Sequence, residues 1–308
     1  MPNKLTEILK IEHPIILGPM RRITLGLLAA EVSACGGLGQ IASSGLSLEQ
    51  LREEIAHAQK ITDKPIGVNI PLHRPYVLEI LQIAAEMGVR IITTSGGNPS
   101  VIMGPAREAK VIVLHKVSTV EMGLKAQRAG VEGVIGMGFE AGGHTGKSQV
   151  TTLCLIPQLV DALDIPVIAA GGIGDYRGYL AALALGASGV EIGTRFLASA
   201  ECGVSSYYKE ALVQAKETST VVVGDEPMML RILKNKAAEF LLERNRDKST
   251  QPRIVDYSSA EGNIDNTIMP AGQGAGLVSK VMPVGDILTE FVEKSRELAA
   301  DINLFLKK

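Results

Sequence analysis

The sequence predicts an α/β fold, a (β/α)8 TIM barrel with a smaller, mostly helical cap after the eighth strand. Short apolar runs rich in Val and Ile alternate eight times with segments of helical length between residues 14 and 196. These runs are apolar on both faces, which is typical of strands in a parallel sheet covered by helices. Eight such units in one series favour a closed barrel, with an open doubly wound sheet as the alternative.

The elements follow one another regularly along the chain. Strands are predicted at residues 14–18, 38–42, 65–70, 90–95, 110–116, 133–138, 166–172 and 189–196. Helices are predicted at residues 24–34, 46–61, 75–88, 118–130, 151–163 and 176–186. In the second of these, Leu48, Leu51, Ile55 and Ala58 recur at helical spacing. One further helix is expected after the fourth strand, where Asn98 and Pro99 form a typical cap and first turn.

After residue 200 the alternation ends and a second unit is predicted. Residues 205–217 and 229–244 look helical, and a polar stretch covers 243–253. We therefore expect a barrel over residues 1–200 and a helical cap and lid segment over 201–283. The final helix, residues 284–308, is expected to pack back on the barrel.

Composition narrows the function classes. The 308 residues carry a net charge of -2 without a basic block, which argues against nucleic acid as a partner. No apolar run approaches the ~20 residues that span a bilayer, and the N-terminus lacks a signal peptide. The three cysteines, Cys35, Cys154 and Cys202, lack the spacing of metal ligands. The sequence predicts a cytoplasmic enzyme for small molecules, without a metal site.

Two glycine turns predict a phosphate site. The segment GGIGD (171–175) follows the seventh strand and GTR (193–195) follows the eighth. In such barrels these two loops commonly bind phosphate, because main-chain N–H groups and a helix N-terminus converge there. Thr194 adds a hydroxyl and Arg195 adds charge. Tight turns that need Gly for a positive φ are the structural alternative.

Polar residues at other strand ends are further candidates. Asn69 ends the third strand, Thr93 to Ser95 end the fourth, and Lys116 ends the fifth. A turn-forming Asn and a solvated Lys are the alternatives without function. Gly18, Pro19 and Met20 end the first strand, where Gly allows the main chain to approach a flat ligand and Met is equally a core residue.

The loop GFEAGGHTGK (138–147) contains the strongest catalytic candidate. His144 stands among glycines after the sixth strand, together with Glu140. The ordinary pKa of histidine, ~6.5, suits proton transfer near neutrality. The other four histidines lack metal-ligand spacing with it, so we expect no zinc. An exposed, idle loop histidine is the alternative.

The motifs EHPIILGPM, KPIGVNI, GFEAGGHTG, PVIAAGGI, GVEIGTRF and PAGQGAGLVSK appear in this order. From Leu5 to about Lys280 the chain resembles the nitronate monooxygenase family, once called 2-nitropropane dioxygenases. That family also contains flavin-dependent enoyl-acyl carrier protein reductases and NAD(P)H:quinone reductases. The resemblance implies an FMN-binding barrel with a helical cap and an oxidoreductase activity.

The resemblance also implies a role for each matching residue. Residues expected to contact FMN are Gly18, Pro19, Met20, Asn69, Lys116, Gly142, Gly171, Gly172, Glu191, Gly193 and Thr194, the phosphate lying at Gly171, Gly172, Gly193 and Thr194. His144 and Lys116 are the expected catalytic residues. Departures from the family pattern are Arg21 and Arg22 in place of small residues, and Met137 and Glu191 where glutamine is common.

Four hypotheses follow for the activity. The first is oxidation of a nitronate with O2 by FMN; the second is NAD(P)H-dependent reduction of an enoyl thioester on acyl carrier protein, or of a quinone. The third is a non-catalytic flavin-binding protein, and the fourth a flavin-free lyase or isomerase of phosphorylated metabolites. A homodimer is considered in each case.

Overall fold

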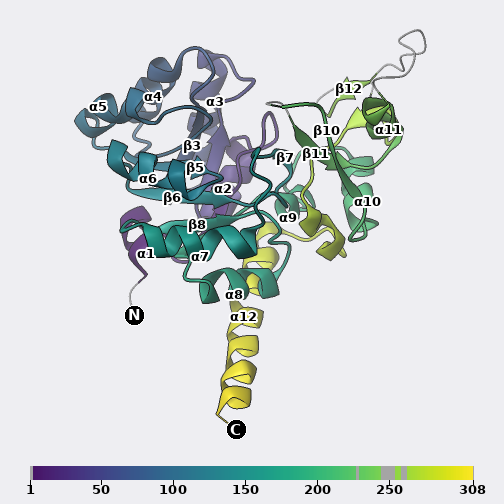
Figure 1. The fold of residues 1–308 in the computed structure, drawn as a ribbon. Helices are drawn as coiled ribbons and strands as arrows, with labels where there is room; N and C mark the ends of the chain where they lie inside the picture. Colours follow the sequence, from purple (N-terminus) through teal and green to yellow (C-terminus); the bar gives the residue numbers. More distant parts are fainter. Residues whose placement is uncertain (1–2, 227–228, 244–253, 258–261, 308) are drawn as a thin grey trace.

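The structure, a computed structural model, describes residues 3–226, 229–243, 254–257 and 262–307. Figure 1 shows a barrel surrounded by helices, a smaller cap beside its mouth, and a long C-terminal helix that projects from the barrel. Within the described residues, no helix is long and apolar enough to cross a membrane.

Eight parallel strands form the barrel. They are β1 (Ile15–Leu17), β2 (Gly39–Ala42), β3 (Ile66–Pro71), β4 (Ile91–Ser95), β5 (Ile112–Val117), β6 (Gly133–Met137), β8 (Val167–Ala170) and β9 (Gly189–Ile192). They pair in the order β1-β9-β8-β6-β5-β4-β3-β2. A bridge between Ile16 and Leu38, with the Leu17 N–H donating to the Leu38 carbonyl at 2.9 Å, brings β1 back to β2. The predicted barrel is confirmed, and the open sheet is excluded.

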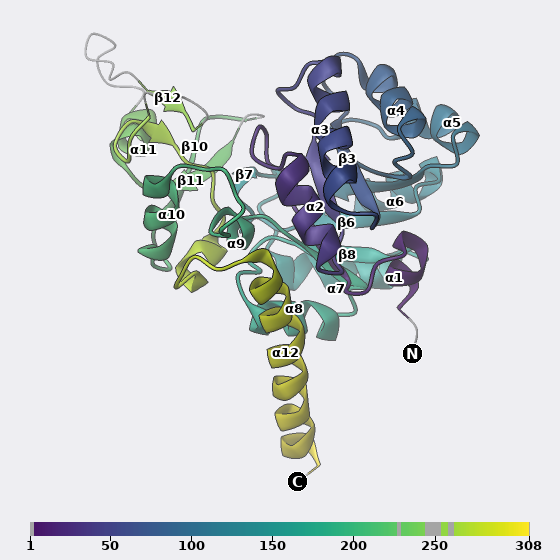
Figure 2. The ribbon, with the colours of Figure 1, turned by 180° about the vertical axis from the view of Figure 1, so that it is seen from behind.

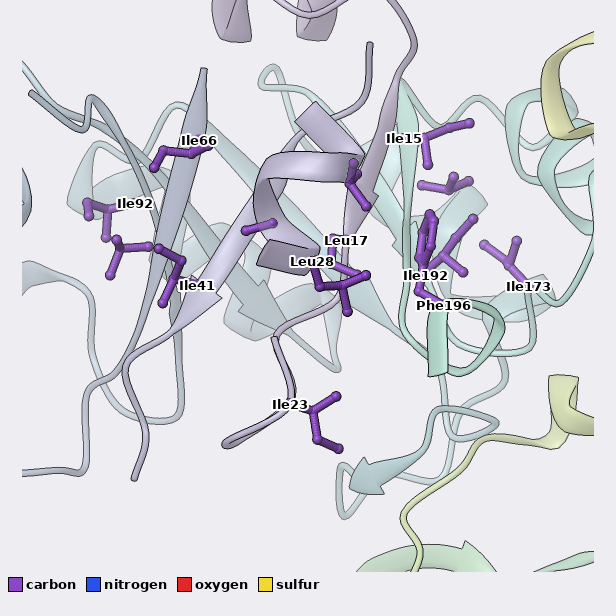
Figure 3. Close-up of a cluster of buried hydrophobic side chains, with 14 of the residues drawn as sticks. Ile15, Leu17, Ile23, Leu28, Ile41, Ile66, Ile92, Ile173, Ile192 and Phe196 are labelled. Carbon is purple, nitrogen blue, oxygen red and sulfur yellow. The ribbon is translucent and has the colours of Figure 1, made fainter. Parts of the chain in front are cut away.

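Helices cover the outside of the strands. They are α2 (Gly26–Ala34), α3 (Leu48–Ile61), α4 (Val77–Glu86), α5 (Ser100–Glu108), α6 (Val120–Ala129), α7 (Thr152–Ala162) and α8 (Tyr176–Ala184). Outward-facing strand residues such as Leu17, Ile41 and Ile192 pack against them, and Figure 3 shows part of this layer with Leu28 of α2. The last helix, α12 (Val284–Leu306), packs against α8 and α2, as the view from behind in Figure 2 shows.

A short N-terminal helix closes the bottom of the barrel. In α1 (Lys4–Leu9), Leu5 and Leu9 are fully buried among the inward-facing side chains of the strands. The Asn3 amide donates to the Ser188 carbonyl at 2.8 Å, which fastens α1 beneath β9. Because this end is filled, a ligand enters the barrel from the carboxyl ends of the strands.

The cap contains strands as well as helices. Its elements are α10 (Ser206–Val213), β10 (Thr220–Val223), β11 (Leu230–Leu233), α11 (Lys236–Leu242), β12 (Val255–Asp256), β13 (Thr267–Ile268) and the 3-10 turn η2 (Gln273–Leu277). The prediction of one helix over 229–244 is wrong, because residues 230–233 form β11, in which Ile232 pairs with Val221 of β10. The side chains of Ile232 and Val223 are buried together with Ala238 of α11. The described part of the cap therefore combines helices with short strands. Most of the polar stretch 243–253 lies outside the described residues.

Candidate functional site

The candidate site is the second of two layers of side chains that point into the barrel. The first layer is apolar and consists of Ile16, Leu38, Ile91, Leu114, Ile135 and Ile168. Successive strand side chains face opposite ways, so positions two residues later also face inward, one step nearer the mouth. These positions hold Gly18, Gln40, Thr93, Lys116, Met137 and Ala170, joined by Asn69 from β3 and Glu191 from β9.

Most polar residues of this mouth layer form one hydrogen-bonded network. The Asn69 amide donates to the Thr93 hydroxyl at 3.0 Å, and Thr93 donates to the Gln40 side-chain oxygen. The Gln40 amide in turn donates to the Leu17 carbonyl at 2.6 Å and to Glu191 Oε2 at 3.3 Å. The network connects five strands, β1, β2, β3, β4 and β9. It therefore holds the ends of these strands in fixed positions at the mouth.

Lys116 completes the network as the cationic member. Its ammonium donates to Glu191 Oε1, and the side chains are 15% and 4% exposed. Lysine is rarely buried unless it is paired, and here the carboxylate supplies that pairing. Two residues expected from the sequence to contact a cofactor are therefore joined by the fold. Sequence reasoning missed Gln40, although an amide inside the apolar run LGQIA was a signal.

His144 lies in a loop that the cap fastens. The short strand β7 (Gly143–His144) pairs with β11, so that His144 stands opposite Leu230. The Thr145 N–H donates to the Met229 carbonyl at 3.2 Å. On the other side, the Ser148 hydroxyl donates to the Ser118 carbonyl at 3.1 Å, just beyond the end of β5. The loop is held between barrel and cap.

Arg231 is the side chain that fixes this loop, and sequence reasoning missed it. It is 4% exposed, and its Nε and Nη2 both donate to the Phe139 carbonyl, at 3.2 and 3.1 Å. Its guanidinium also lies over the Phe139 ring, 4.9 Å from the centroid. The position was assigned to a helix, which hid the strand pairing that turns Arg231 toward the loop.

The surroundings of His144 lower its pKa. Neighbouring segments remove part of its hydration although the ring retains exposed surface, and the positive charges of His73 and Arg74 add to the effect. His73 and Arg74 follow β3 and are exposed. A lower pKa keeps the imidazole neutral at pH 7, so it can accept a proton.

The glycine turn at the end of β8 has the geometry that only glycine adopts readily, whereas Gly193 at the end of β9 has a φ of -109°. Gly171 and Gly172 have φ of +99° and +74°. A Cβ on Gly171 would meet the Gly138 carbonyl oxygen at 2.9 Å, whereas one on Gly193 would meet only Met20, at 3.6 Å to Sδ. Thr194 opens the short helix α9 (Thr194–Leu197) directly after this open position.

The cap lies against the same two turns. The Gly272 N–H donates to the Thr194 hydroxyl at 3.0 Å. Gly142 and Gly272 approach so closely that a Cβ on Gly142 would come within 2.5 Å of the Gly272 nitrogen. The motif PAGQGAG therefore joins the His144 loop to the turn at Thr194.

Three other candidate side chains have structural partners. Glu140 accepts hydrogen bonds from the Thr152 N–H at 2.9 and 3.1 Å and so caps α7. Arg195 is 6% exposed and donates to the Ala198 carbonyl at 3.5 Å, so it does not add charge to the glycine turns. Arg21, which stands where the family pattern has a small residue, pairs with Asp256 of the cap at 2.9 Å. This ion pair compensates part of the positive charge that Arg21 adds.

The residues present fit a flavin nucleotide. A phosphate needs close main-chain approach, and the open position at Gly193 beside two left-handed glycines provides it. Within the described residues, no group of three or more His, Cys, Asp or Glu is arranged to hold a metal ion. Fold and site together define a (β/α)8 barrel with a layer of polar side chains at the carboxyl ends of its strands.

Comparison with known proteins identifies the family. The model of the family described as nitronate monooxygenase matches residues 2–294. A probable nitronate monooxygenase of Staphylococcus aureus strain MSSA476 is 35% identical, over 96% of this chain and 98% of its own. The chain therefore belongs to the nitronate monooxygenase family and is a flavin-dependent oxidoreductase.

Solved structures share the architecture. FabK from Thermotoga maritima is 35% identical, with a TM-score of 0.92 over 99% of both chains. Nitroalkane oxidase from Streptomyces ansochromogenes is 24% identical, with a TM-score of 0.83 over 97% of this chain and 99% of its own, and shows the shared fold.

Proposed function

We propose that this protein is an FMN-dependent nitronate monooxygenase, which oxidises nitronates or similar stabilised carbanions with O2. One observation carries the proposal: His144 stands beside His73 and Arg74, at a mouth whose inward layer contains Lys116. Cationic groups around a neutral imidazole suit an anionic substrate that needs positioning. The family model, which describes nitronate monooxygenases, supports the same reading.

The residues proposed to hold FMN form three groups, one for the phosphate and two for the ring. Gly171, Gly172, Gly193 and Thr194 would bind the phosphate through main-chain N–H groups and a hydroxyl. Gly18, Pro19, Met20 and Gly142 would line the ring, with Asn69, Lys116 and Glu191 beneath it. When bound, FMN would supply the electron acceptor for the carbanion.

The protein's own groups would handle charge and protons. Arg74 would attract the substrate anion to the mouth, since it lies close enough to His144 to influence the pKa of that imidazole. The neutral His144 accepts a proton from the substrate carbon when the neutral nitroalkane enters, and orients the anion otherwise. Lys116 supplies positive charge from the inward layer.

Reduction of an enoyl thioester is the second candidate function. The similarity to FabK, an enoyl-acyl carrier protein reductase, favours it. In that case NAD(P)H is the electron donor and acyl carrier protein the substrate carrier, and His144 provides a proton to the substrate. A quinone as the acceptor is a further form of this alternative. A cytoplasmic location and a homodimer are proposed for either function.

Anaerobic stopped-flow mixing separates the candidates. The FMN-loaded protein is mixed with propyl-2-nitronate, NADH or NADPH, and flavin absorbance is followed. Bleaching by the nitronate, followed by oxygen uptake on aeration, is the expected result. Rapid bleaching by NADH or NADPH with turnover of a crotonyl thioester, and no nitronate-dependent oxygen uptake, would reverse the order of the two functions.

A further inference from the structure

The inward layer at the mouth contains a buried carboxylate as well as a partly buried ammonium. Glu191 is 4% exposed on its side chain, and both of its oxygens have partners. Lys116 donates to Oε1, and Gln40 donates to Oε2 at 3.3 Å. The positive charge of Lys116 is therefore presented at the mouth as one half of an ion pair.

Stability alone does not account for this pair. Removing two charges from water costs more than their attraction commonly returns, and apolar replacements of buried pairs are often as stable. The layer immediately below contains Leu114, Ile168 and other apolar side chains, which offer no solvation. These apolar side chains screen the field of the pair only weakly, so the pair would act strongly on a ligand that displaces water from the mouth.

We propose that Glu191 is a positioning residue that holds Lys116 in place, compensates its charge and thereby lowers the reduction potential of the bound flavin. This inference rests on the proposed function, because it requires a flavin at the mouth. Reduction adds two electrons and one proton to the flavin, so the reduced ring carries one more negative charge than the oxidised ring. A Lys116 without a partner would stabilise the negative charge of the reduced flavin strongly. A Lys116 paired with Glu191 stabilises it less, so the reduced flavin passes its electrons to an acceptor more readily.

The Glu191→Gln variant tests the proposal. It removes the negative charge but keeps the size of the side chain, so Lys116 becomes uncompensated. The midpoint potential of the FMN-loaded full-length protein is measured by spectroelectrochemical titration with dithionite. We expect the preference for reduced over oxidised FMN to rise about tenfold, which corresponds to ~30 mV for a two-electron couple.

Three further variants control the measurement. Glu191→Asp keeps the charge and should restore the wild-type potential. Glu121→Gln removes an exposed carboxylate that pairs with Lys125 at 2.6 Å on α6, and should leave the potential unchanged. The double variant Lys116→Met/Glu191→Gln removes both charges of the pair, buries no unpaired charge, and should return to a value near wild type.

The outcomes distinguish the two proposals. If wild-type protein binds no flavin, the proposed function fails and the role of Glu191 fails with it. If flavin is bound but Glu191→Gln and Glu121→Gln have equal potentials, only the role of Glu191 is overturned. If Glu191→Gln does not fold, Lys116→Met decides: a lower potential supports the proposal, and an unchanged potential overturns it. Denaturant unfolding of the flavin-free single and double variants measures the coupling free energy between Lys116 and Glu191 independently of activity.

Discussion

Replacing Arg231 by Met should separate the fold of the barrel from the position of its catalytic loop. The variant replaces the charged side chain by an unbranched apolar one and removes both hydrogen bonds to the Phe139 carbonyl. Hydrogen bonds that involve a charged group contribute ~1.5–3 kcal/mol, and two bonds to one acceptor are not additive. We therefore expect the free energy of unfolding to fall by about 3 kcal/mol.

Turnover should respond more strongly than stability. The Phe139 carbonyl lies at the start of the loop that ends in His144, and Arg231 itself stands opposite Gly143 in the sheet. Since a displacement of ~1 Å in a catalytic group costs about 100-fold in rate, we expect a loss of that order with the flavin still bound. Denaturant unfolding and steady-state turnover are measured side by side.

Arg52 provides the matched control. It pairs with Glu86 at 2.7 Å on the surface, with 48% of its side chain exposed. Such pairs contribute ~0–1 kcal/mol, so Arg52→Met should be nearly as stable as wild type and fully active. Equal stability and equal turnover in Arg231→Met and Arg52→Met would refute the assignment of Arg231 to the loop.

Three further predictions concern the site and the pH dependence of the fold. His144→Ala should keep flavin content but lower turnover by ~10²- to 10⁴-fold, and unchanged turnover would remove His144 from the mechanism. Gly172→Val should strip the flavin, because φ is +74° and a Cβ stands 3.3 Å from that of Glu140; retained flavin absorbance would refute the phosphate site. Burial lowers the pKa of His115 to about 4, from an ordinary value of 6.5. Unfolded chains then bind more protons between these values, so stability falls as pH drops from 7 to 4.5, by about 2 kcal/mol. The His115→Gln variant should lack this loss in denaturant titrations, while a variant of the exposed His57, His57→Gln, should retain it; equal pH slopes in all three proteins would contradict the buried, neutral state of His115.

Much of the barrel could be predicted from the sequence because its signal is local. Strand character depends on residues two positions apart and helical character on residues three or four apart, and both periods are read within a short window. The same locality identified Asn69, Lys116 and the two glycine turns, since each lies near the end of a strand or directly follows one. The cap was harder, because short runs such as LRIL (230–233) suit a strand or a helix equally until a partner strand is known.

The sequence by itself indicated most of the residues that stand at the mouth, and the tertiary structure added Gln40 and decided how they pair. Lys116 and Glu191 are 75 positions apart, and Arg231 and Phe139 are 92 apart. No local period connects such residues, because their contact depends on closure of the barrel and on the docking of the cap. Side-chain chemistry is a property of the sequence, whereas the field and the orientation of each group are set by neighbours that only the folded chain brings together.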